Sequence, residues 1–377
     1  PDQLVAHPDI DIVVELMGGT ELAYDLCVEA IAYGKHLVTA NKALIAERGN
    51  ELFAAAAEQG VAIHYEAAVA GGIPIIKALR EGLAGNRING IAGIINGTGN
   101  FILTEMRDKG RPFADVLAEA QALGYAESDP TFDVEGIDAA HKLTILASIA
   151  YGVPLQFEKA YTEGISRITA EDVEQADNLG YIIKHLGISK RTEAGLELRV
   201  HPTLIPKERL LASVHGVKNA IAVMGDAVGP TLYYGAGAGA EPTASAVVAD
   251  LLDVARDIAT EHHYRVPYLA FSGITEGDDS LPILPMEDIV TAYYLRLLAV
   301  DRPGVLARVA TILSEQGISI EAIIQKEATE GELVPIILLT HRTREKQMNE
   351  VIRQLESLSD IAGPVTRIRV ESLDEQQ

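Results

Sequence analysis

The first 64 residues alternate short β-branched runs with helical patterns, and no other feature of the sequence constrains the fold as strongly. Residues 10–16 (IDIVVEL) predict a strand that ends in the small-residue turn Gly18-Gly19-Thr20. A helix closed by Gly34 follows, and then come a strand at 36–39, a helix at about 43–59 and a strand at 61–64. This β-α-β-α-β order with short connections predicts a parallel sheet covered by helices, as in doubly wound nucleotide-binding folds.

The usual opening strand and its G-x-G-x-x-G turn do not occur near the start of the sequence, which opens on Pro1 without an initiator methionine. We therefore expect an incomplete N-terminus, with the first part of the nucleotide-binding fold missing. A later glycine string, Gly235 to Gly239, follows a strand pattern and precedes a helix pattern over 240–262. By itself, this string is typical of a flexible turn.

The rest of the chain divides into a mixed middle part and a small C-terminal module. The middle part predicts helices at 73–84, 98–109, 113–123, 134–151 and 169–187 and strands at 88–96, 196–205 and 217–224. The C-terminal module predicts, in order, strand 292–300, helix 304–316, strands 318–327 and 332–340, helix 343–356 and strand 364–370. The first pattern indicates an α+β domain and the second a ferredoxin-like β-α-β-β-α-β sandwich, joined by a linker at 276–288.

Composition excludes several classes of protein. The chain has 54 acidic and 31 basic residues, so its net charge of −23 argues against binding nucleic acid or an anionic membrane. The single cysteine, Cys27, excludes an intramolecular disulfide framework and a cysteine-built zinc site, and it fits a reducing cytoplasm. No apolar run reaches the ~20 residues that cross a bilayer.

The densest group of chemically capable residues lies between Ala120 and Lys142. Five carboxylates precede the lysine in this segment: Glu127, Asp129, Asp133, Glu135 and Asp138. Asp138 and Lys142 are four residues apart on a predicted helix, which places them on one face, and a solvated ion pair is the ordinary interpretation of such spacing. Here, however, apolar residues surround the pair on nearly every side, which predicts a buried helix. Buried charges are scarce unless paired or functional, and a desolvated lysine can exchange a proton near neutrality, so we favour a functional pair.

Two other segments have local features that suit ligands. Asn96-Gly97-Thr98 ends a strand pattern and starts a helix, so free N–H groups there suit an anion, while an ordinary helix cap at Thr98 is the alternative. The histidines His64, His262 and His263 lack the spacing of a metal site, and we expect core or surface roles for them.

The run A-x3-G-Y-A-x2-D-P-x2-D-V-x-G-x-D-x3-K from Ala120 to Lys142 resembles the signature of homoserine dehydrogenases through its whole length. The similarity extends over nearly the whole chain, through GGT at 18–20, ANK at 40–42, EAAVAGGIPII at 66–76, NGTGNFIL at 96–103 and GAGAGAEPTASAVVAD at 235–250. The C-terminal module, with Asp301 to Leu306 at its first strand-to-helix turn and Pro303 at the first helical position, resembles an ACT domain.

The resemblance implies an α/β protein of three domains. These are a Rossmann-like nucleotide-binding domain (1–72 plus about 238–262, N-terminally truncated), a catalytic and dimerisation α+β domain (73–237 plus about 263–285), and a ferredoxin-like ACT regulatory domain (290–372). The implied activity is the NAD(P)-dependent interconversion of aspartate 4-semialdehyde and homoserine in threonine, methionine and isoleucine biosynthesis. NAD and NADP cannot be told apart, because the segment that meets the ribose is not in the sequence.

The resemblance also assigns roles residue by residue. Lys142 resembles the proton-transfer lysine, and Lys42 a second lysine near the cofactor. The substrate-binding positions are Glu127, Asp133, Asp138, Gly97 and Thr98, and the cofactor-binding positions are Thr20, Lys42, Gly124 and Gly239. The positions that match a sodium-binding loop are Glu66, Val69, Gly71 and Ile73, and the effector positions of the ACT domain are Asp301, Gly304, Val305 and Leu306.

We expect a cytoplasmic homodimer or homotetramer that binds a small-molecule substrate and threonine as an effector, and neither nucleic acid nor membrane. Two alternatives remain open at this point. One is an amino-acid sensor in which the ACT module dominates and catalysis is lost. The other is a dehydrogenase for a related amino acid, which the full signature at 120–142 disfavours.

Overall fold

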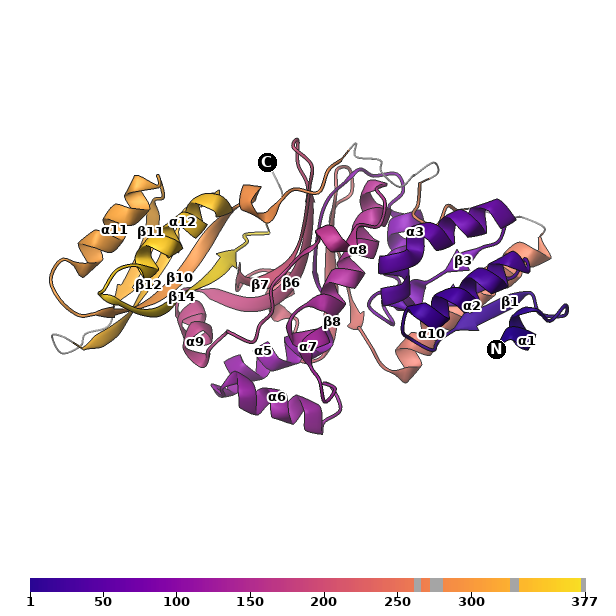
Figure 1. Ribbon diagram of the computed structural model, residues 1–377, viewed down its shortest axis with the longest axis horizontal. Helices are drawn as coiled ribbons and strands as arrows, with labels where there is room; N and C mark the ends of the chain where they lie inside the picture. The colour runs from indigo at the N-terminus through magenta and orange to yellow at the C-terminus, as the bar shows by residue number, and fades with distance from the viewer. Residues whose placement is uncertain (261–265, 272–280, 326–331, 374–377) are drawn as a thin grey trace.

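A three-stranded parallel sheet occupies the N-terminal end of the computed structural model, which describes residues 1–260, 266–271, 281–325 and 332–373 (Figure 1). Its strands, β1 (Ile12–Glu15), β2 (His36–Thr39) and β3 (Ile63–His64), lie in the order β1-β2-β3. The helices that precede and connect them are α1 (Asp2–Val5), α2 (Glu21–Ala32) and α3 (Lys42–Gln59). The parallel pairing of β1 with β2 and of β2 with β3 confirms the predicted β-α-β-α-β order.

Helix α10 (Ala240–Ala259) returns to this sheet from much later in the chain. Its Ala246, Val247 and Val254 form one apolar cluster with Val38 of β2 and Ala67. The glycine string before it begins in the last two residues of strand β9 (Gly229–Ala236) and continues to Gly239, which is the N-cap of the helix.

The middle of the molecule is built on antiparallel strands that continue into the C-terminal module. Within the described residues the sheet has 11 strands, nine of them in the order β11-β12-β10-β14-β7-β6-β4-β8-β9. The strands of the middle part are β4 (Ile88–Ile94), β5 (Tyr161–Thr162), β6 (Tyr181–Arg191), β7 (Leu196–Pro206), β8 (Lys218–Gly225) and β9. Its longer helices are α5 (Gly97–Lys109), α6 (Phe113–Ala122), α8 (Ile137–Tyr151) and α9 (Ala170–Asn178). Its short turns of helix are η1 (Glu66–Ala68), α4 (Ile75–Lys77), η2 (Ala78–Gly82), α7 (Thr131–Val134), η3 (Phe157–Lys159) and η4 (Leu210–Ser213).

The C-terminal module has the ferredoxin-like order that the sequence predicts. Its elements are η5 (Met286–Asp288), β10 (Val290–Val300), α11 (Val305–Glu315), β11 (Ile320–Gln325), β12 (Leu333–Thr340), β13 (Thr343–Arg344), α12 (Glu345–Glu356) and β14 (Ile361–Val370). Strand β14 also pairs in parallel with β7, through Arg369 opposite Thr203 and Val370 opposite Leu204. The module is therefore joined to the middle part by backbone pairing as well as by the chain itself.

Some local predictions are wrong. The predicted helix 169–187 ends at Asn178, because Gly180 adopts a φ of +86° and the apolar run from Tyr181 continues as strand β6. This strand is buried on both faces over its centre, so its sequence shows no alternation that could separate it from a buried helix. The predicted helix 73–84 is only the short α4 and η2, and the predicted helix 134–151 is interrupted at Gly136, with a φ of +85°.

Two further corrections concern the C-terminal third. Helix α11 begins at Val305 with Gly304 as its N-cap, so Pro303 lies before the helix and not at its first position. Part of the predicted linker 276–288 is held in place, since Leu196 N–H donates to the carbonyl of Pro282 and Leu284 N–H to that of Leu196. Residues 276–280 of that prediction lie outside the described part of the chain.

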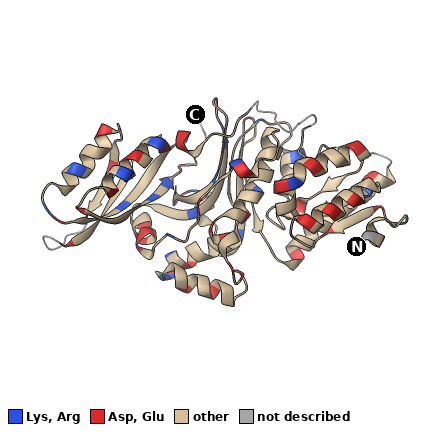
Figure 2. Cartoon of the chain, viewed as in Figure 1, with Lys and Arg blue, Asp and Glu red and all other residues tan. Residues whose placement is uncertain are grey.

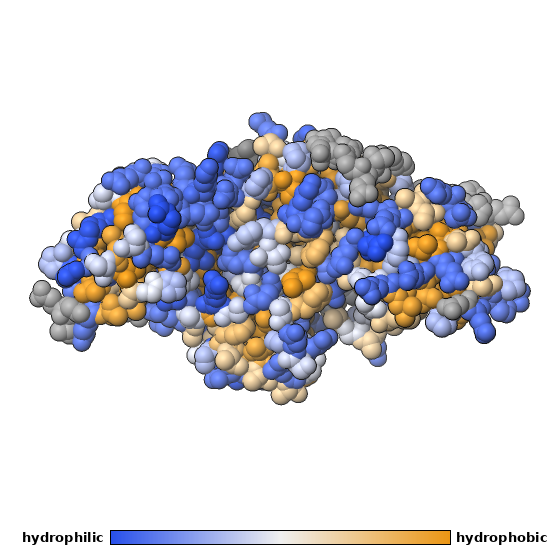
Figure 3. Space-filling view, in the orientation of Figure 1, coloured by the Kyte–Doolittle hydropathy of each residue, from blue (hydrophilic) through white to orange (hydrophobic). Residues whose placement is uncertain are grey.

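The surface carries both charged and apolar residues. Acidic side chains recur along α2, α3 and α10 (Figure 2). On the face that Figure 3 shows, hydrophilic and hydrophobic residues are interspersed. Within the described residues, no helix has the length and apolar character needed to span a membrane.

Candidate active site

Helix α8 passes between the central sheet and the helices of the N-terminal sheet (Figure 1), and it is buried from Asp138 to Tyr151. Gly136, at its N-cap, has the left-handed conformation that lets the chain turn sharply into the helix. The Lys142 ammonium donates to Oδ2 of Asp138 at 2.7 Å and to the carbonyl of Ile95 at 2.9 Å. The predicted buried pair on one helix face is therefore present.

Lys42 joins this pair from the other side. It is the first residue of α3, at the carboxyl end of β2, and its ammonium lies 3.0 Å from Oδ1 of Asp138. The side chain of Lys42 is 32% exposed, whereas that of Asp138 is 5% exposed. One carboxylate thus holds two lysines from different parts of the fold, and the more open lysine belongs to helix α3 of the N-terminal sheet.

Asn96 completes the cluster, in a role that the sequence pattern does not predict. Its Oδ1 accepts from Gly99 N–H, and its Nδ2 donates to Asp133 at 2.7 Å and to Asp138 at 2.9 Å. The helix cap of α5 is therefore Asn96 and not Thr98, whose hydroxyl instead donates to the carbonyl of Tyr125 at 2.6 Å. The signal for Asn96 was its place just before the helix, since asparagine is a strong N-cap residue.

The charges in this cluster are set by burial and by the lysines. Burial alone would raise the pKa of Asp138, but Lys142, Lys42 and the Asn96 hydrogen bond outweigh it and lower this pKa to about 2. Burial raises the pKa of Asp133 above its usual value, and the charge of Asp138 adds to this, against the hydrogen bond from Asn96. Asp138 is therefore a fixed negative charge next to a carboxyl group that is more easily protonated.

The remaining substrate-binding candidates lie around this cluster at different depths. Glu127 is exposed in the loop that follows α6, and within the described residues its carboxylate makes no contact with Asp138 or either lysine. Gly97 opens α5, and a Cβ atom placed on it would lie 2.8 Å from the carbonyl of Val217. Gly124, a cofactor-binding candidate in the same part of the chain, is exposed with a φ of +74°.

The nucleotide-side candidates meet where β1 and β2 end. Gly18 and Gly19 both have positive φ, and Thr20 follows at the N-cap of α2 without a side-chain cap hydrogen bond. Buried Glu15 accepts from the N–H groups of Met17 and Gly18 and from the Thr39 hydroxyl. Hydrogen bonds to Glu15 therefore hold the turn in place, and its two glycines leave the backbone of the turn uncovered by side chains.

Asn41 links this turn to helix α3. It donates to the carbonyl of Gly19 and caps α3 by accepting from Leu44 N–H. Asn41 therefore fixes the distance between the glycine turn and the start of Lys42's helix.

The candidate cation loop packs against the glycine string. Each carboxylate oxygen of Glu66 accepts one backbone N–H group, from Ile76 or from Lys77, and each keeps a second lone pair that could bind a cation together with backbone carbonyls. Ala70 and Gly71 have φ values of +56° and +47°, and Gly72 N–H donates to the carbonyl of Ala236. His64 lies near Asp250, with Nδ1 3.7 Å from Oδ1, while His262 and His263 lie outside the described residues.

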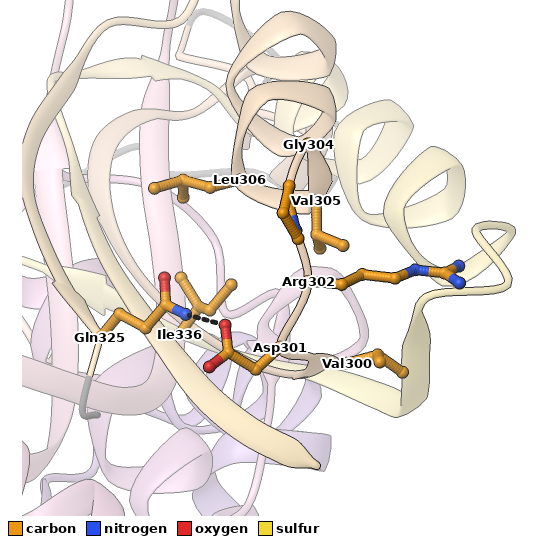
Figure 4. A pocket seen from close by; sticks show the side chains of 9 residues that line it. Val300, Asp301, Arg302, Gly304, Val305, Leu306, Gln325 and Ile336 are labelled. Atoms are coloured by element: carbon orange, nitrogen blue, oxygen red, sulfur yellow. Dashed lines mark hydrogen bonds between the residues drawn. The ribbon is translucent and has the colours of Figure 1, made fainter. Parts of the chain in front are cut away.

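A pocket of about 300 Å³ lies at the first strand-to-helix turn of the C-terminal module. All four effector candidates line it, together with Gln325 and Ile336. Gln325 donates to Asp301 at 3.2 Å across the pocket, and the Arg302 side chain points away from this pair (Figure 4). Arg302 instead pairs with Asp360, as Arg308 does.

Comparison with known proteins finds three families along the chain. Profiles match the NAD-binding domain of homoserine dehydrogenase over residues 1–66, homoserine dehydrogenase over 74–252 and the ACT domain over 293–360. A homoserine dehydrogenase from Pseudomonas aeruginosa is 67% identical over 372 residues, which are 98% of this chain and 85% of that protein.

Solved structures of homoserine dehydrogenases are also similar to this chain. The homoserine dehydrogenase of Thiobacillus denitrificans is 63% identical with a TM-score of 0.94, over 99% of this chain and 85% of that one. A hyperthermophilic archaeal homoserine dehydrogenase mutant in complex with NADPH is 30% identical with a TM-score of 0.60, over 68% of this chain and 75% of that one. The fold and the lysine–carboxylate cluster thus define an NAD(P)-dependent oxidoreductase with an ACT domain. The chain belongs to the homoserine dehydrogenase family.

Proposed function

We propose that the chain catalyses the reversible NAD(P)-dependent reduction of L-aspartate 4-semialdehyde to L-homoserine. The observation that carries this proposal is the convergence of Lys42 and Lys142 on the buried carboxylate of Asp138. Such a cluster places proton donors beside a fixed negative charge in a site largely shielded from water. A chain that had become only an amino-acid sensor would have no need to keep this geometry.

Lys142 is the proposed proton donor and acceptor. Two of its three N–H groups are engaged by Asp138 and the Ile95 carbonyl, which leaves one for a substrate oxygen. In the direction of reduction, the ammonium donates a proton to the aldehyde oxygen as the carbonyl carbon is reduced. In the direction of oxidation, the amine form takes the hydroxyl proton. Lys42, which is more exposed, would polarise the carbonyl or relay the proton.

The substrate's amino-acid end would be held by the surrounding carboxylates and the start of α5. Asp138 and Asp133 share the Asn96 amide, so their orientation is fixed before substrate arrives. Glu127 would bind the substrate ammonium from the loop after α6, and Gly97 with Thr98 would face the α-carboxylate. Binding energy from the amino-acid end would then orient the reacting carbon.

When bound, the reduced nicotinamide dinucleotide, NADPH or NADH, would supply the hydride for reduction, and the oxidised form would accept it in the reverse direction. The residues present fit it: Gly18 and Gly19 bring bare backbone to the carboxyl end of the parallel sheet, where nucleotides bind in such folds. Thr20 would contact the cofactor at the start of α2, with Gly124, Gly239 and Lys42 towards its nicotinamide end. The NADPH complex of the archaeal relative supports a nicotinamide dinucleotide as the cofactor.

A sodium ion is proposed for the loop formed by Glu66, Val69, Gly71 and Ile73. The successive positive φ values at Ala70 and Gly71 turn backbone carbonyls in an unusual direction, and carbonyl oxygens suit a hard cation. We assign this ion a structural role, because its loop supports the glycine string that leads into α10.

We further propose that threonine binds the ACT pocket at Asp301, Gly304, Val305 and Leu306 and inhibits the enzyme. Feedback by an end product would fit the threonine, methionine and isoleucine pathway. We also propose a cytoplasmic homodimer or homotetramer, divided into the three domains given above. Light scattering after size exclusion measures the oligomeric state directly.

The proposed reaction is tested by absorbance at 340 nm with homoserine and either NADP or NAD. Reduction of one cofactor that depends on homoserine is the expected result. The absence of turnover with both cofactors, in a protein whose melting temperature rises with threonine, would instead support a sensor. Turnover only with another amino alcohol would move the chain to a related dehydrogenase.

A further inference from the structure

The junction between strand β14 of the ACT domain and the middle part contains a buried arginine that makes contact with both sides. Arg369 has no exposed surface, and it lies where β14 is paired with β10 on one side and β7 on the other. On the ACT side, its guanidinium donates twice to Glu345, at 3.0 and 2.6 Å. On the other side, it donates to Glu163 at 2.8 Å and to the Tyr161 hydroxyl at 3.1 Å.

This arrangement fixes Glu163 in one place. Its Oε2 also accepts from the Tyr161 hydroxyl at 2.7 Å, and Arg367 lies 3.7 Å away. The main chain of Glu163 is held as well. Its N–H donates to the carbonyl of Val200, and its carbonyl accepts a hydrogen bond from Nε2 of His185 at 2.9 Å. Side chain and backbone at this position are therefore both fixed by buried partners.

The residues next to Glu163 support the turn that leads into α8. A Cβ atom placed on Gly164 would lie 2.7 Å from Cα of Glu135, so the two backbones are in close contact. Ile165 N–H donates to the carbonyl of Val134 at 2.9 Å. The ring of His185 lies 3.0 Å from the position of a Cβ on Gly136, and the Thr162 side chain lies 3.1 Å from it.

Gly136 is the N-cap of the helix that carries Asp138 and Lys142, and its carbonyl accepts the first helical hydrogen bond, from Ala140 N–H at 2.9 Å. A shift of segment 163–165 would therefore move the first turn of α8, where Asp138 lies. Asp138 sits between two lysines within about 3 Å, so a small displacement changes both contacts.

We propose that Glu163, held by Arg369 of the ACT strand, is a positioning residue for the Asp138–Lys142 pair. Arg369 and Glu163 thereby make the geometry of the active site depend on the docking of the ACT domain. The coupling runs through packed backbone and does not require an effector to be bound. This inference rests on the proposed catalytic role of the pair.

The junction also offers a matched control. Glu371, just after β14, accepts from buried Arg199 at 2.5 Å and from Lys190 at 2.6 Å, and so it also ties the ACT strand to β6 and β7. Within the described residues, Glu371 makes no hydrogen bond or ion pair with segment 161–165, although its partner Arg199 lies opposite Tyr161 in the β5–β7 pairing. Glu163→Gln and Glu371→Gln each remove one carboxylate charge from a buried arginine at the same junction, but only Glu163 lies in the segment that packs against the turn before α8.

The test compares these two variants in the full chain by steady-state kinetics and hydrogen exchange. We expect both to lose a few degrees of melting temperature. Glu163→Gln should lower kcat about 10-fold or more, with the affinity for the nicotinamide cofactor unchanged, while Glu371→Gln keeps kcat within about twofold. Segment 134–142 should exchange its amide hydrogens faster in Glu163→Gln alone.

A kcat for Glu163→Gln within about twofold of the wild type, or an equal fall in both variants, would overturn the positioning role. Arg369→Gln should resemble Glu163→Gln, and the double variant should be no slower than the slower single one. If the wild type itself shows no turnover with homoserine, the proposed function fails, while hydrogen exchange at 134–142 still decides whether Glu163 holds the turn.

Discussion

The ammonium of Lys42 lies 3.0 Å from Oδ1 of Asp138, although the two residues belong to helices on different sheets. Lys142 reaches the other oxygen of the same carboxylate at 2.7 Å. A buried charge is tolerated only when it is paired, and this pairing fixes the relation between the nucleotide side and the substrate side of the site. The chemistry of the site therefore depends on how α3 and α8 meet.

Replacing Lys142 by alanine should reduce kcat by about 10²–10⁴-fold, the range for loss of a general acid or base. The effect on semialdehyde binding should be small, because the substrate's amino-acid end is bound elsewhere. Lys346→Ala, at an exposed position on α12, is the control and should retain full activity. Turnover of Lys142→Ala equal to wild type would remove Lys142 from the mechanism.

Asn96→Ala should lower both activity and stability. It removes the N-cap of α5 and the amide that orients Asp133 and Asp138, so we expect a loss of about 1–3 kcal/mol in the free energy of unfolding. Thr169→Ala, which removes the N-cap of α9 away from the site, should lose comparable stability while kcat is unchanged. If the two variants had the same kcat, Asn96 would be a helix cap and nothing more.

The depressed pKa of Asp138 predicts a pH-dependent contribution to stability. Its pKa is about 2 in the folded protein and about 3.9 in an unfolded chain, so the unfolded chain binds the proton more readily. The contribution, on the order of 2 kcal/mol, is present above pH ~4 and is lost as the pH falls towards ~2. The stability difference between wild type and Asp138→Asn, measured by urea unfolding, should therefore shrink on acidification. A difference that stays constant from pH 6 to pH 3 would contradict this, and Glu58→Gln, at an exposed site, serves as the control.

Threonine inhibition should be lost in Asp301→Ala, with basal kcat retained. The pocket contains the Asp301–Gln325 hydrogen bond, and a threonine ammonium would be expected to bind the carboxylate. Deleting residues from 290 onward should also abolish inhibition, but it would remove the β14–β7 pairing and leave Glu163 without Arg369. The point variant is therefore the sharper experiment, and unchanged inhibition in Asp301→Ala would place the effector elsewhere.

Sodium should stabilise the protein more than choline does at equal ionic strength, as measured by melting temperature. Gly71→Ala should abolish this difference, because its backbone φ of +47° disfavours a side chain and a Cβ would lie 2.7 Å from the carbonyl of Gly237. Gly82→Ala is the control, since a Cβ at Gly82 meets no atom within 4 Å. Equal melting temperatures in the two salts would argue against a sodium site.

Much of the fold could be predicted because local patterns and tertiary packing agree. The parallel order of the first sheet and the ferredoxin-like order of the last module follow from short connections and from alternating helix and strand periods. The prediction failed at 181–187, where the strand is buried on both faces and its apolar run carries no period. Only pairing with β4 and β7 distinguishes this segment from a continuation of α9.

In the candidate site, too, local contacts could be predicted and contacts between distant segments could not. The spacing of Asp138 and Lys142 on an apolar helix was sufficient to predict a buried pair, since helical geometry is local. The hydrogen bonds from Asn96 to Asp133 and Asp138 could not be predicted from the sequence, because they join segments that are distant in sequence.

By itself, the sequence determined the order of the elements in the first sheet and in the C-terminal module, the burial of α8 and the pairing of Asp138 with Lys142, because each depends on local patterns of residues. The tertiary structure alone decided that Lys42 forms an ion pair with Asp138, that the Glu66 carboxylate accepts hydrogen bonds from backbone N–H groups, and that Arg369 binds Glu163. These contacts join different sheets or distant segments of the chain. Their distances are set by the packing of whole layers, and no local pattern of residues records that packing.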